Sequence, residues 1–284
     1  MKAAEIIADI LKREGVDILI AYPVNHVIEY SARADIRTII VRQERTGLHM
    51  ADAISRMSSG KTLGVFAMQH GPGAENAFGG VAQAYGESVP ILVLPQGYAR
   101  RIAHVDPNFN SVLNFKHVTK MAEPITSVKE IPNIFRRAFT QLRSGRGRPV
   151  LIEIPTDIYA EEFEGPLTYT PGLATKFGPD PDAVRQAADV LLVAKNPVIY
   201  AGQGVHYAEA WPQLKRLAEL LACPVTTSLE GKSAFPEDHP LALGSGGRAI
   251  PRTVHEYLNG ADLIFGIGCS FTETNFGVTI PKGK

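Results

Sequence analysis

Cysteine and tryptophan are scarce in this 284-residue sequence, which contains two cysteines and one tryptophan. Cys223 and Cys269 lie in apolar stretches, so we expect buried thiols in a reducing compartment and not a disulfide framework. No apolar run approaches the roughly 18 residues of a membrane-spanning helix. The early charges Lys2, Glu5 and Asp9 are not typical of a signal peptide. The sequence therefore predicts a cytoplasmic location and no membrane partner.

A surplus of charge is also missing, because 29 basic residues balance 29 acidic residues. A nucleic-acid or polybasic membrane interface would need a basic excess, so no nucleic-acid partner is expected. Hydrophobic residues make up 45% of the chain, which is within the range of ordinary globular proteins. The length suits about two domains of roughly 150 residues each.

Continuous apolar runs dominate the first half of the sequence, at 16–21, 36–41, 63–68, 91–94 and 150–154. Such runs are typical of strands buried on both faces, as in a parallel sheet covered by helices. Segments with helical spacing of apolar residues lie before and between these runs, at 3–10, Glu44–Met57, 76–85 and 131–142. Alternating strands and helices predict an α/β domain over residues 1–165.

Glycine and proline then gather around residues 160–180, which predicts a linker over 166–181. A second alternation follows, with helices predicted at 182–193 and 210–221 and strands at 198–201, 224–227 and Leu263–Ile267. We therefore predict two doubly wound parallel-sheet domains, the second Rossmann-like and spanning 182–284. An open doubly wound domain usually continues past such a strand, so we interpret this second domain as incomplete.

Polar residues follow the apolar runs of the first domain, where ligands bind in open parallel sheets. Glu44 follows the second run, Gly71-Pro72-Gly73 the third, and Gln96 the fourth. Each has a plain structural interpretation as well. Glu44 could simply stabilise a helix N-terminus through the helix dipole, and the glycines could simply build a strand-to-helix turn.

Taken together, these segments resemble thiamine-diphosphate (ThDP) enzymes of the acetolactate synthase type. The stretch 41–53 resembles the family's segment around the glutamate that activates the cofactor, and 71–76 with 82–90 resembles the next signature. The similarity continues along the chain through Phe109-Asn110, Val118-Thr119-Lys120, 145–157, Asn196-Pro197-Val198, 201–205 and Ala261-Asp262-Leu263. Several motifs in order and at matching spacing cover essentially the whole chain.

The resemblance implies that residues 1–165 form a pyrimidine-binding domain with Glu44 as the catalytic, cofactor-activating carboxylate. In this family the glutamate hydrogen-bonds the aminopyrimidine and so promotes loss of the thiazolium carbon's proton, after which the cofactor reacts with a 2-oxo acid. Pro23, Gly71 and Asn76 match positions that line the pyrimidine pocket. His70, Gln96 and Asn110 are weaker candidates for substrate contacts, because they match nearby positions or lie at strand ends.

Three departures from the family pattern leave the substrate open. Phe109-Asn110 stands where Phe-Gln is common, Ala21-Tyr22-Pro23-Val24 where Gly-x-Pro-Gly is usual, and His70 where serine is common. For His70, filling the turn is about as well supported as touching substrate. The resemblance therefore implies a transferase or lyase, either a carboligase or a decarboxylase.

The family's diphosphate-binding domain is missing, because no Gly-Asp-Gly motif occurs. That domain holds Mg²⁺, so no metal ligand is predicted in this chain, and activity would need a partner chain or further sequence. A homo-oligomer is implied as well. Gly202-Gln203-Gly204 and Gly266-Ile267-Gly268 lack a third glycine, so we favour a structural role and leave FAD open. Alternatives are a non-catalytic binding or regulatory module and a nucleotide-binding protein.

Overall fold

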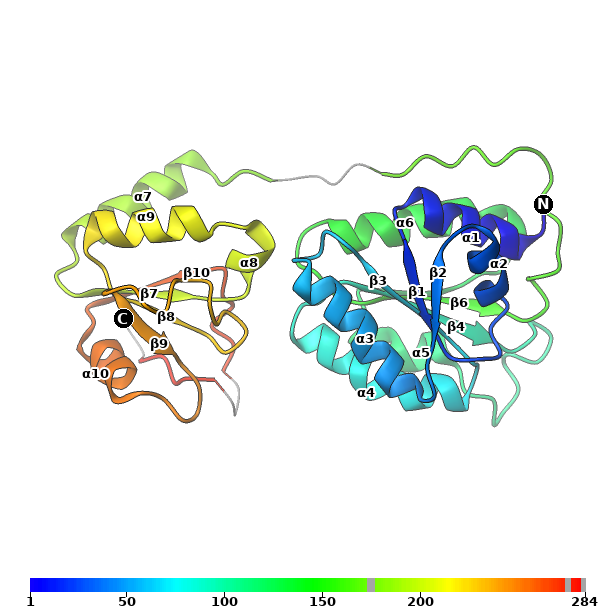
Figure 1. The fold of residues 1–284 in the computed structure, drawn as a ribbon, viewed down its shortest axis with the longest axis horizontal. Coiled ribbons are helices and arrows are strands. Elements are labelled where there is room, and N and C mark those ends of the chain that lie inside the picture. Colours follow the sequence, from blue (N-terminus) through cyan, green and yellow to red (C-terminus); the bar gives the residue numbers. More distant parts are fainter. Residues whose placement is uncertain (173–176, 274–276, 282–284) are drawn as a thin grey trace. The chain divides into compact units, whose positions relative to one another are not determined.

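The computed structural model describes residues 1–172, 177–273 and 277–281. The chain divides into two compact units, Met1–Lys176 and Phe177–Lys284. The division falls inside the predicted linker 166–181, of which 173–176 lie outside the described residues, as do 274–276 and 282–284 of the predicted second domain. Each unit is an α/β layer structure with one parallel sheet (Figure 1).

The first unit is built on a six-stranded parallel sheet in the order β2-β1-β3-β4-β6-β5. The central strands are fully buried because both of their faces are covered, as their unbroken apolar sequences require. The strands are β1 (Ile18–Ala21), β2 (Arg37–Ile40), β3 (Gly64–Met68), β4 (Ile91–Gly97), β5 (Met121–Pro124) and β6 (Val150–Pro155).

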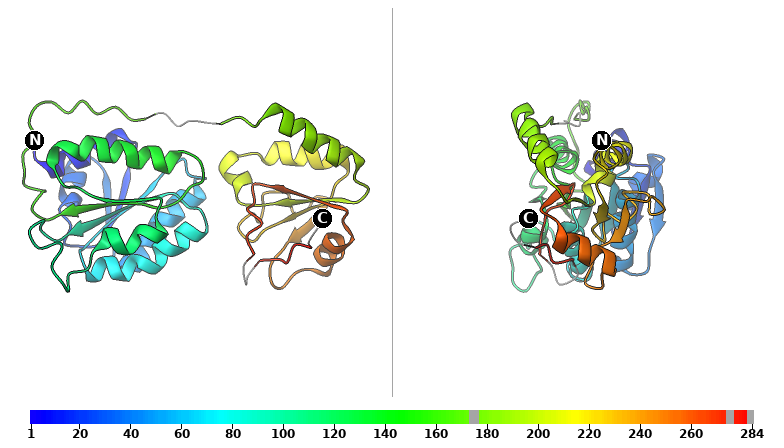
Figure 2. Two further views of the ribbon diagram at one scale, coloured as in Figure 1. Left: turned by 180° about the vertical axis from the view of Figure 1, so that it is seen from behind. Right: turned by 90° about the vertical axis from the view of Figure 1, so that its left-hand side faces the viewer.

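Helices cover both faces of this sheet (Figure 1). One core lies under α1 (Ala3–Arg13), α2 (Val27–Arg33) and α6 (Ile131–Arg143). The other lies under α3 (Glu44–Met57), α4 (Pro72–Gly86) and the short α5 (Ser111–Phe115). Figure 2, seen from behind, shows the same layers. Two opposite helical layers mean that successive crossovers run in both directions along the sheet, which makes the unit doubly wound.

Small residues bring α3 and α4 close together. An added Cβ at Gly80 would lie 2.4 Å from the end of the Leu48 side chain, so a larger residue would fit at this contact only if Leu48 moved. Glycine is required at Gly64, because a Cβ there would lie 1.8 Å from the Ala51 carbonyl oxygen. These approaches hold the middle of α3 close to both α4 and the start of β3.

The second unit has a four-stranded parallel sheet in the order β10-β7-β8-β9. One core lies under α8 (Gly204–Ala208) and α9 (Trp211–Leu221), and the other under α10 (Arg252–Gly260). The remaining elements are α7 (Pro181–Val193), β7 (Pro197–Ala201), β8 (Val225–Thr227), β9 (Ala242–Ser245) and β10 (Leu263–Ile267). The predicted α/β class with two parallel sheets is confirmed.

Two local predictions were wrong. The run 36–41 was expected to be buried on both faces, but β2 is an edge strand and Ile40 is 51% exposed. Cys269 was expected to be buried, but it is only half-buried, while Cys223 is buried; both thiols are free. In each case the residue lies at the margin of a sheet, where an apolar sequence does not guarantee cover.

Candidate active site

The carboxyl ends of β1 and β3 form the topological switch point of the first sheet. β1 leads through α2 to β2, and β3 leads through α4 to β4, so the two connections leave in opposite directions along the sheet. A crevice opens at such a point, and ligands of open α/β sheets bind there. The β1–α2 turn (22–26) and the β3–α4 turn (69–71) border this crevice.

Glu44 is a buried carboxylate beside this point. It is the first residue of α3, where the helix dipole favours a negative charge, and it is 7% exposed. The amide of Asn76, from the second turn of α4, donates to its Oε2 at 2.6 Å. No hydrogen bond to Oε1 is seen among the residues that the structure describes. A buried carboxylate with an open oxygen can accept a further donor from a ligand.

Gly73 allows the α4 N-terminus to reach Glu44. An added Cβ at Gly73 would lie 3.1 Å from Glu44 Oε1 and 3.0 Å from the Gln69 side chain. A larger residue would make a tight contact here, and Gln69 or the Glu44 carboxylate would have to move by a small distance. The Gly-Pro-Gly turn contributes more than a connection, because its last glycine lies close to the Glu44 carboxylate.

His70 and Gly71 line the β3 side of the crevice. Gly71 has a φ of +52°, and an added Cβ would lie 2.6 Å from the Tyr98 hydroxyl oxygen. The His70 ring packs edge-on against Tyr98 with centroids 4.6 Å apart. Within the described part of the chain, His70 Nδ1 is buried without a hydrogen-bond partner. A buried ring nitrogen without a protein partner needs a hydrogen-bond partner from water or a ligand.

Gln96 lies at the carboxyl end of β4 and is buried. Its Oε1 also lacks a hydrogen-bond partner among the described residues, which is costly unless a ligand or solvent supplies one. Glu153 on the neighbouring β6 is a second buried acid near this edge. Burial raises the pKa of Glu153, and hydrogen bonds from the hydroxyl and backbone N–H of Ser111 oppose that rise in part.

Pro23 and Asn110 differ from the other candidates because both are exposed. Pro23 lies in the β1–α2 turn at the crevice. Asn110 caps α5, where its side-chain oxygen accepts the Leu113 N–H at 2.8 Å. A structural role therefore explains part of Asn110, and only its amide nitrogen remains to meet a substrate.

The structure thus brings Glu44 and Asn76 into direct contact and places Pro23, His70, Gly71 and Gln96 at the same edge of the sheet. Sequence reasoning missed Asn25 and Tyr98. Asn25 is buried beneath the β1–α2 turn and donates to the carbonyls of Met68 and Leu94 at 2.9 and 3.1 Å. A lone asparagine shortly after a proline is a common turn signal, so this anchoring could not be predicted from the sequence.

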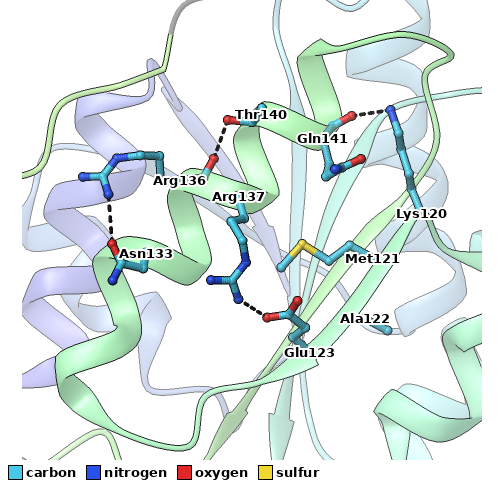
Figure 3. A pocket seen from close by; sticks show the side chains of 9 residues that line it. All are labelled: Lys120, Met121, Ala122, Glu123, Asn133, Arg136, Arg137, Thr140 and Gln141. Carbon is cyan, nitrogen blue, oxygen red and sulfur yellow. Dashed lines mark hydrogen bonds and ion pairs between the residues drawn. The ribbon is translucent and has the colours of Figure 1, made fainter.

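A cavity of about 560 Å³ lies elsewhere in this unit, between β5 and α6 (Figure 3). Its charged groups are paired internally. Lys120 donates to the Gln141 carbonyl at 2.7 Å, and Arg137 pairs with Glu123. The cavity lies at the β5 edge of the sheet, with β6 and β4 between it and the switch point. We therefore place the candidate site at the switch point and not in this cavity.

The second unit has its own switch point, between β7 and β10, and glycine backbones fill it. Gly202 N–H donates to Ile267 O and Gly204 N–H to Gly268 O, both at 2.8 Å. A Cβ at Gly202 would lie 2.5 Å from the Gly268 carbonyl oxygen. These glycines let two turns pack directly against each other, which accounts for them without a nucleotide.

Metal and membrane features are absent from the described residues. Over 1–172, 177–273 and 277–281, no group of three or more histidine, cysteine, aspartate or glutamate side chains is placed to hold a metal ion. In the same residues no helix combines the length and apolar character needed to cross a bilayer.

Two family models match the chain. Residues 1–122 match the N-terminal TPP binding domain of thiamine pyrophosphate enzymes, and residues 184–283 match their central domain. The chain belongs to the thiamine pyrophosphate enzyme family. The family resemblance inferred from the sequence is therefore confirmed, and the N-terminal match contains Glu44 and Asn76.

Relatives within this family share about a third of their residues with the chain. The probable acetolactate synthase large subunit of Methanocaldococcus jannaschii is 35% identical over 284 residues, covering 96% of this chain and 48% of the relative. Glyoxylate carboligase of Escherichia coli is 32% identical, covering 98% and 48%. The chain thus spans about half the length of the curated relatives it matches.

A solved structure shows the same architecture. Benzoylformate decarboxylase from Polynucleobacter necessarius superposes with a TM-score of 0.86 at 25% identity, covering 100% of this chain and 54% of that one. In this thiamine pyrophosphate enzyme family, carboligases and a decarboxylase are therefore both similar to the chain, and neither reaction is singled out.

Proposed function

We propose that this chain is the N-terminal portion of a ThDP-dependent enzyme that acts on 2-oxo acids as a carboligase or a decarboxylase. The observation that carries the proposal is the seating of Glu44. A buried carboxylate at a sheet switch point is held by Asn76 through one oxygen, and its other oxygen is open. Burying a carboxylate is costly, and such an arrangement is typical of a group with a ligand to bind.

The chemistry of Glu44 fits an aminopyrimidine ring. Its Oε1 can share a proton with a ring nitrogen, and the low-dielectric surroundings strengthen that hydrogen bond. When bound, ThDP supplies an acidic thiazolium carbon and an electron sink for chemistry beside a carbonyl group. The chain's part is to hold and exchange one proton at Glu44 Oε1 while Asn76 fixes Oε2.

The remaining candidates take supporting roles in this proposal. Pro23, Gly71 and Asn76 line the pyrimidine pocket. His70 and Gln96 face the substrate, because each has a buried polar atom that a carboxylate or carbonyl substrate, or water beside it, would satisfy. Asn110 has only its amide nitrogen to offer, and it stands at the periphery of the site.

We further propose that the remaining parts of the site come from a diphosphate-binding domain, on a partner chain or on further sequence of the same polypeptide. That domain would hold Mg²⁺ on the cofactor's phosphate oxygens, which suits a hard cation. Without it we expect no turnover. A homo-oligomer and a cytoplasmic location belong to the same proposal. For the second unit we propose a packing role for its glycines, with FAD left open.

The test is Glu44→Gln in the complete enzyme, meaning this chain together with a diphosphate-binding domain. Glutamine keeps the size of the side chain but cannot accept and return the proton, so kcat should fall by about a hundredfold or more. The unfolding temperature should stay the same or rise, because a buried charge is removed.

A matched control is Glu29→Gln, which changes the first-turn glutamate of α2, an exposed residue paired with Arg33. Both variants lose the same favourable interaction with a helix dipole. Glu29→Gln should keep full activity. Full activity of Glu44→Gln would refute the catalytic role and support a non-catalytic binding module.

A further inference from the structure

Val24 has an unusual backbone conformation. Its φ is +68°, in the left-handed region that β-branched residues avoid. Among the described residues, seven other non-glycine residues have positive φ, and none of them is β-branched. They are Asp35, Ser59, Ser88, Glu209, Ala222, Ser233 and Phe271.

The residues on either side hold this conformation in place. Tyr22 N–H donates to the Ala67 carbonyl at 2.9 Å, which fixes the turn's beginning on β3. Pro23 has a ring-restricted φ. On the other side Asn25 is tied to the carbonyls of Met68 and Leu94. Strained residues persist where their surroundings determine them in this way, and they gather at functional sites.

Val24 contributes nothing to the core that would explain its retention. Its side chain is 62% exposed. A glycine would adopt the same φ without strain. Val24 instead belongs to the β1–α2 turn, which borders the switch point on the β1 side, while the turn that carries His70 and Gly71 borders it on the β3 side. An exposed apolar group in that turn is available to contact a ligand bound at the switch point.

We propose that Val24 is a specificity-determining residue, whose isopropyl group restricts the crevice to 2-oxo acids with short aliphatic side chains. The proposal rests on the proposed function. Val24 takes no part in proton transfer and acts by excluding bulk. Because the turn is held at Tyr22 and Asn25, the backbone that carries Val24 cannot move away to admit a larger substrate.

The experiment compares Val24→Gly with the unaltered complete enzyme, using pyruvate and phenylglyoxylate as substrates. Removing the side chain should raise the ratio of kcat/KM for phenylglyoxylate over that for pyruvate by about tenfold or more, the size expected for a pocket contact of this kind. The unfolding temperature should not fall, because strain is relieved and no core contact is lost.

The control is Ser59→Gly, which replaces another residue with left-handed backbone conformation. Ser59 lies in the α3–β3 connection, at the amino ends of the strands and away from the candidate site. It should leave the substrate ratio unchanged. An unchanged ratio in Val24→Gly, with Glu44→Gln inactive, would overturn this inference alone. A marked loss of stability in Val24→Gly would overturn it too, by showing a packing role. Absence of turnover by the unaltered enzyme would overturn the proposed function and this inference with it.

Discussion

The two units both contain a parallel sheet with a switch point, but the residues around the two switch points differ. In the first unit the strand ends and turns around the switch point carry a buried acid, a strained valine and two buried polar atoms that have no partner among the described residues. In the second unit the corresponding turns are joined by hydrogen bonds between glycine backbones. The first arrangement leaves polar groups for a ligand to satisfy, whereas the second satisfies its own.

This difference shows why fold alone does not locate function. Both units offer the same geometric opportunity at the carboxyl ends of their strands. The units differ in whether the buried polar groups at those strand ends have hydrogen-bond partners. A buried polar group without a partner destabilises the fold, so it is expected mainly where a ligand supplies the partner. Three substitutions test the contrast, from the largest expected effect to the smallest.

Gly202→Ala should have the largest of the three effects, which is a loss of stability. The added methyl group would meet the Gly268 carbonyl oxygen at 2.5 Å and Cys269 at 2.7 Å. Backbone cannot move aside cheaply, so we expect a loss of about 3 kcal/mol, at the upper end for overpacking. The chain's single tryptophan, Trp211, lies in the second unit, so its fluorescence during urea unfolding reports on that unit.

Gly260→Ala provides the comparison, because an added Cβ there meets nothing within 4 Å. It lies at the end of α10 and should leave the urea midpoint unchanged or slightly higher. If Gly202→Ala were equally harmless, the second switch point would be open enough to hold a ligand, and the contrast between the units would fail.

Asn76→Ala should have the intermediate effect, which is a loss of activity. It removes the amide that donates to Glu44 Oε2 at 2.6 Å. A hydrogen bond to a charged group contributes roughly 1.5–3 kcal/mol, so kcat should fall by about ten- to a hundredfold. Because Asn76 acts through Glu44, the pH–rate profile should also move.

Asn133→Ala is the matched control. Asn133 is an exposed asparagine on α6 of the same unit, and it accepts from Arg136. Its replacement should change neither kcat nor the pH–rate profile. A fall in kcat for Asn76→Ala with an unmoved profile would show that Asn76 does not tune Glu44.

Glu153→Gln should have the smallest effect, visible in how stability depends on pH. Burial raises the pKa of Glu153 in the folded protein, so the folded state binds a proton more readily than the unfolded state. Stability is therefore lost as pH rises from the ordinary glutamate range through the raised pKa. Glutamine removes that loss, so the melting temperature of the variant relative to that of the unaltered protein should rise as the pH increases above the ordinary glutamate range.

Asp157→Asn should show the opposite sign. Partial burial raises the pKa of Asp157, but hydrogen bonds from Arg100 lower it overall. The Asp157 carboxylate stabilises the folded state above the pKa that it has in the unfolded state. The asparagine variant should therefore become less stable relative to the unaltered protein as the pH rises. Circular dichroism melts across the pH range measure both variants, and matching signs would contradict this assignment of the two acids.

The sequence predicted the long elements well. The helix Glu44–Met57 and the strand Leu263–Ile267 begin and end where expected, because their apolar periodicity is strong and their boundaries are marked. The short elements α5, β5 and β9 were not predicted, since four or five residues carry too little periodicity. The edge position of β2 was not predicted either, because apolar residues do not reveal which strand lacks a neighbour.

The candidate site also contains residues that the sequence predicted and residues that it did not. Glu44 and Asn76 were found together because they fall in a recognisable motif at strand-to-helix junctions. The conformation of Val24 and the anchoring by Asn25 depend on contacts with β3 and β4, more than 40 residues away along the chain. No local pattern encodes such contacts, and Tyr98 against Gly71 was missed for the same reason.

The central claim is that Glu44 activates bound ThDP, and proton exchange tests it most directly. The rate at which the cofactor's thiazolium C2 proton exchanges with deuterium can be followed by proton NMR in the complete enzyme. We predict that Glu44→Gln lowers this rate by about a hundredfold or more while Glu29→Gln leaves it unchanged. An undiminished rate in Glu44→Gln would contradict the account.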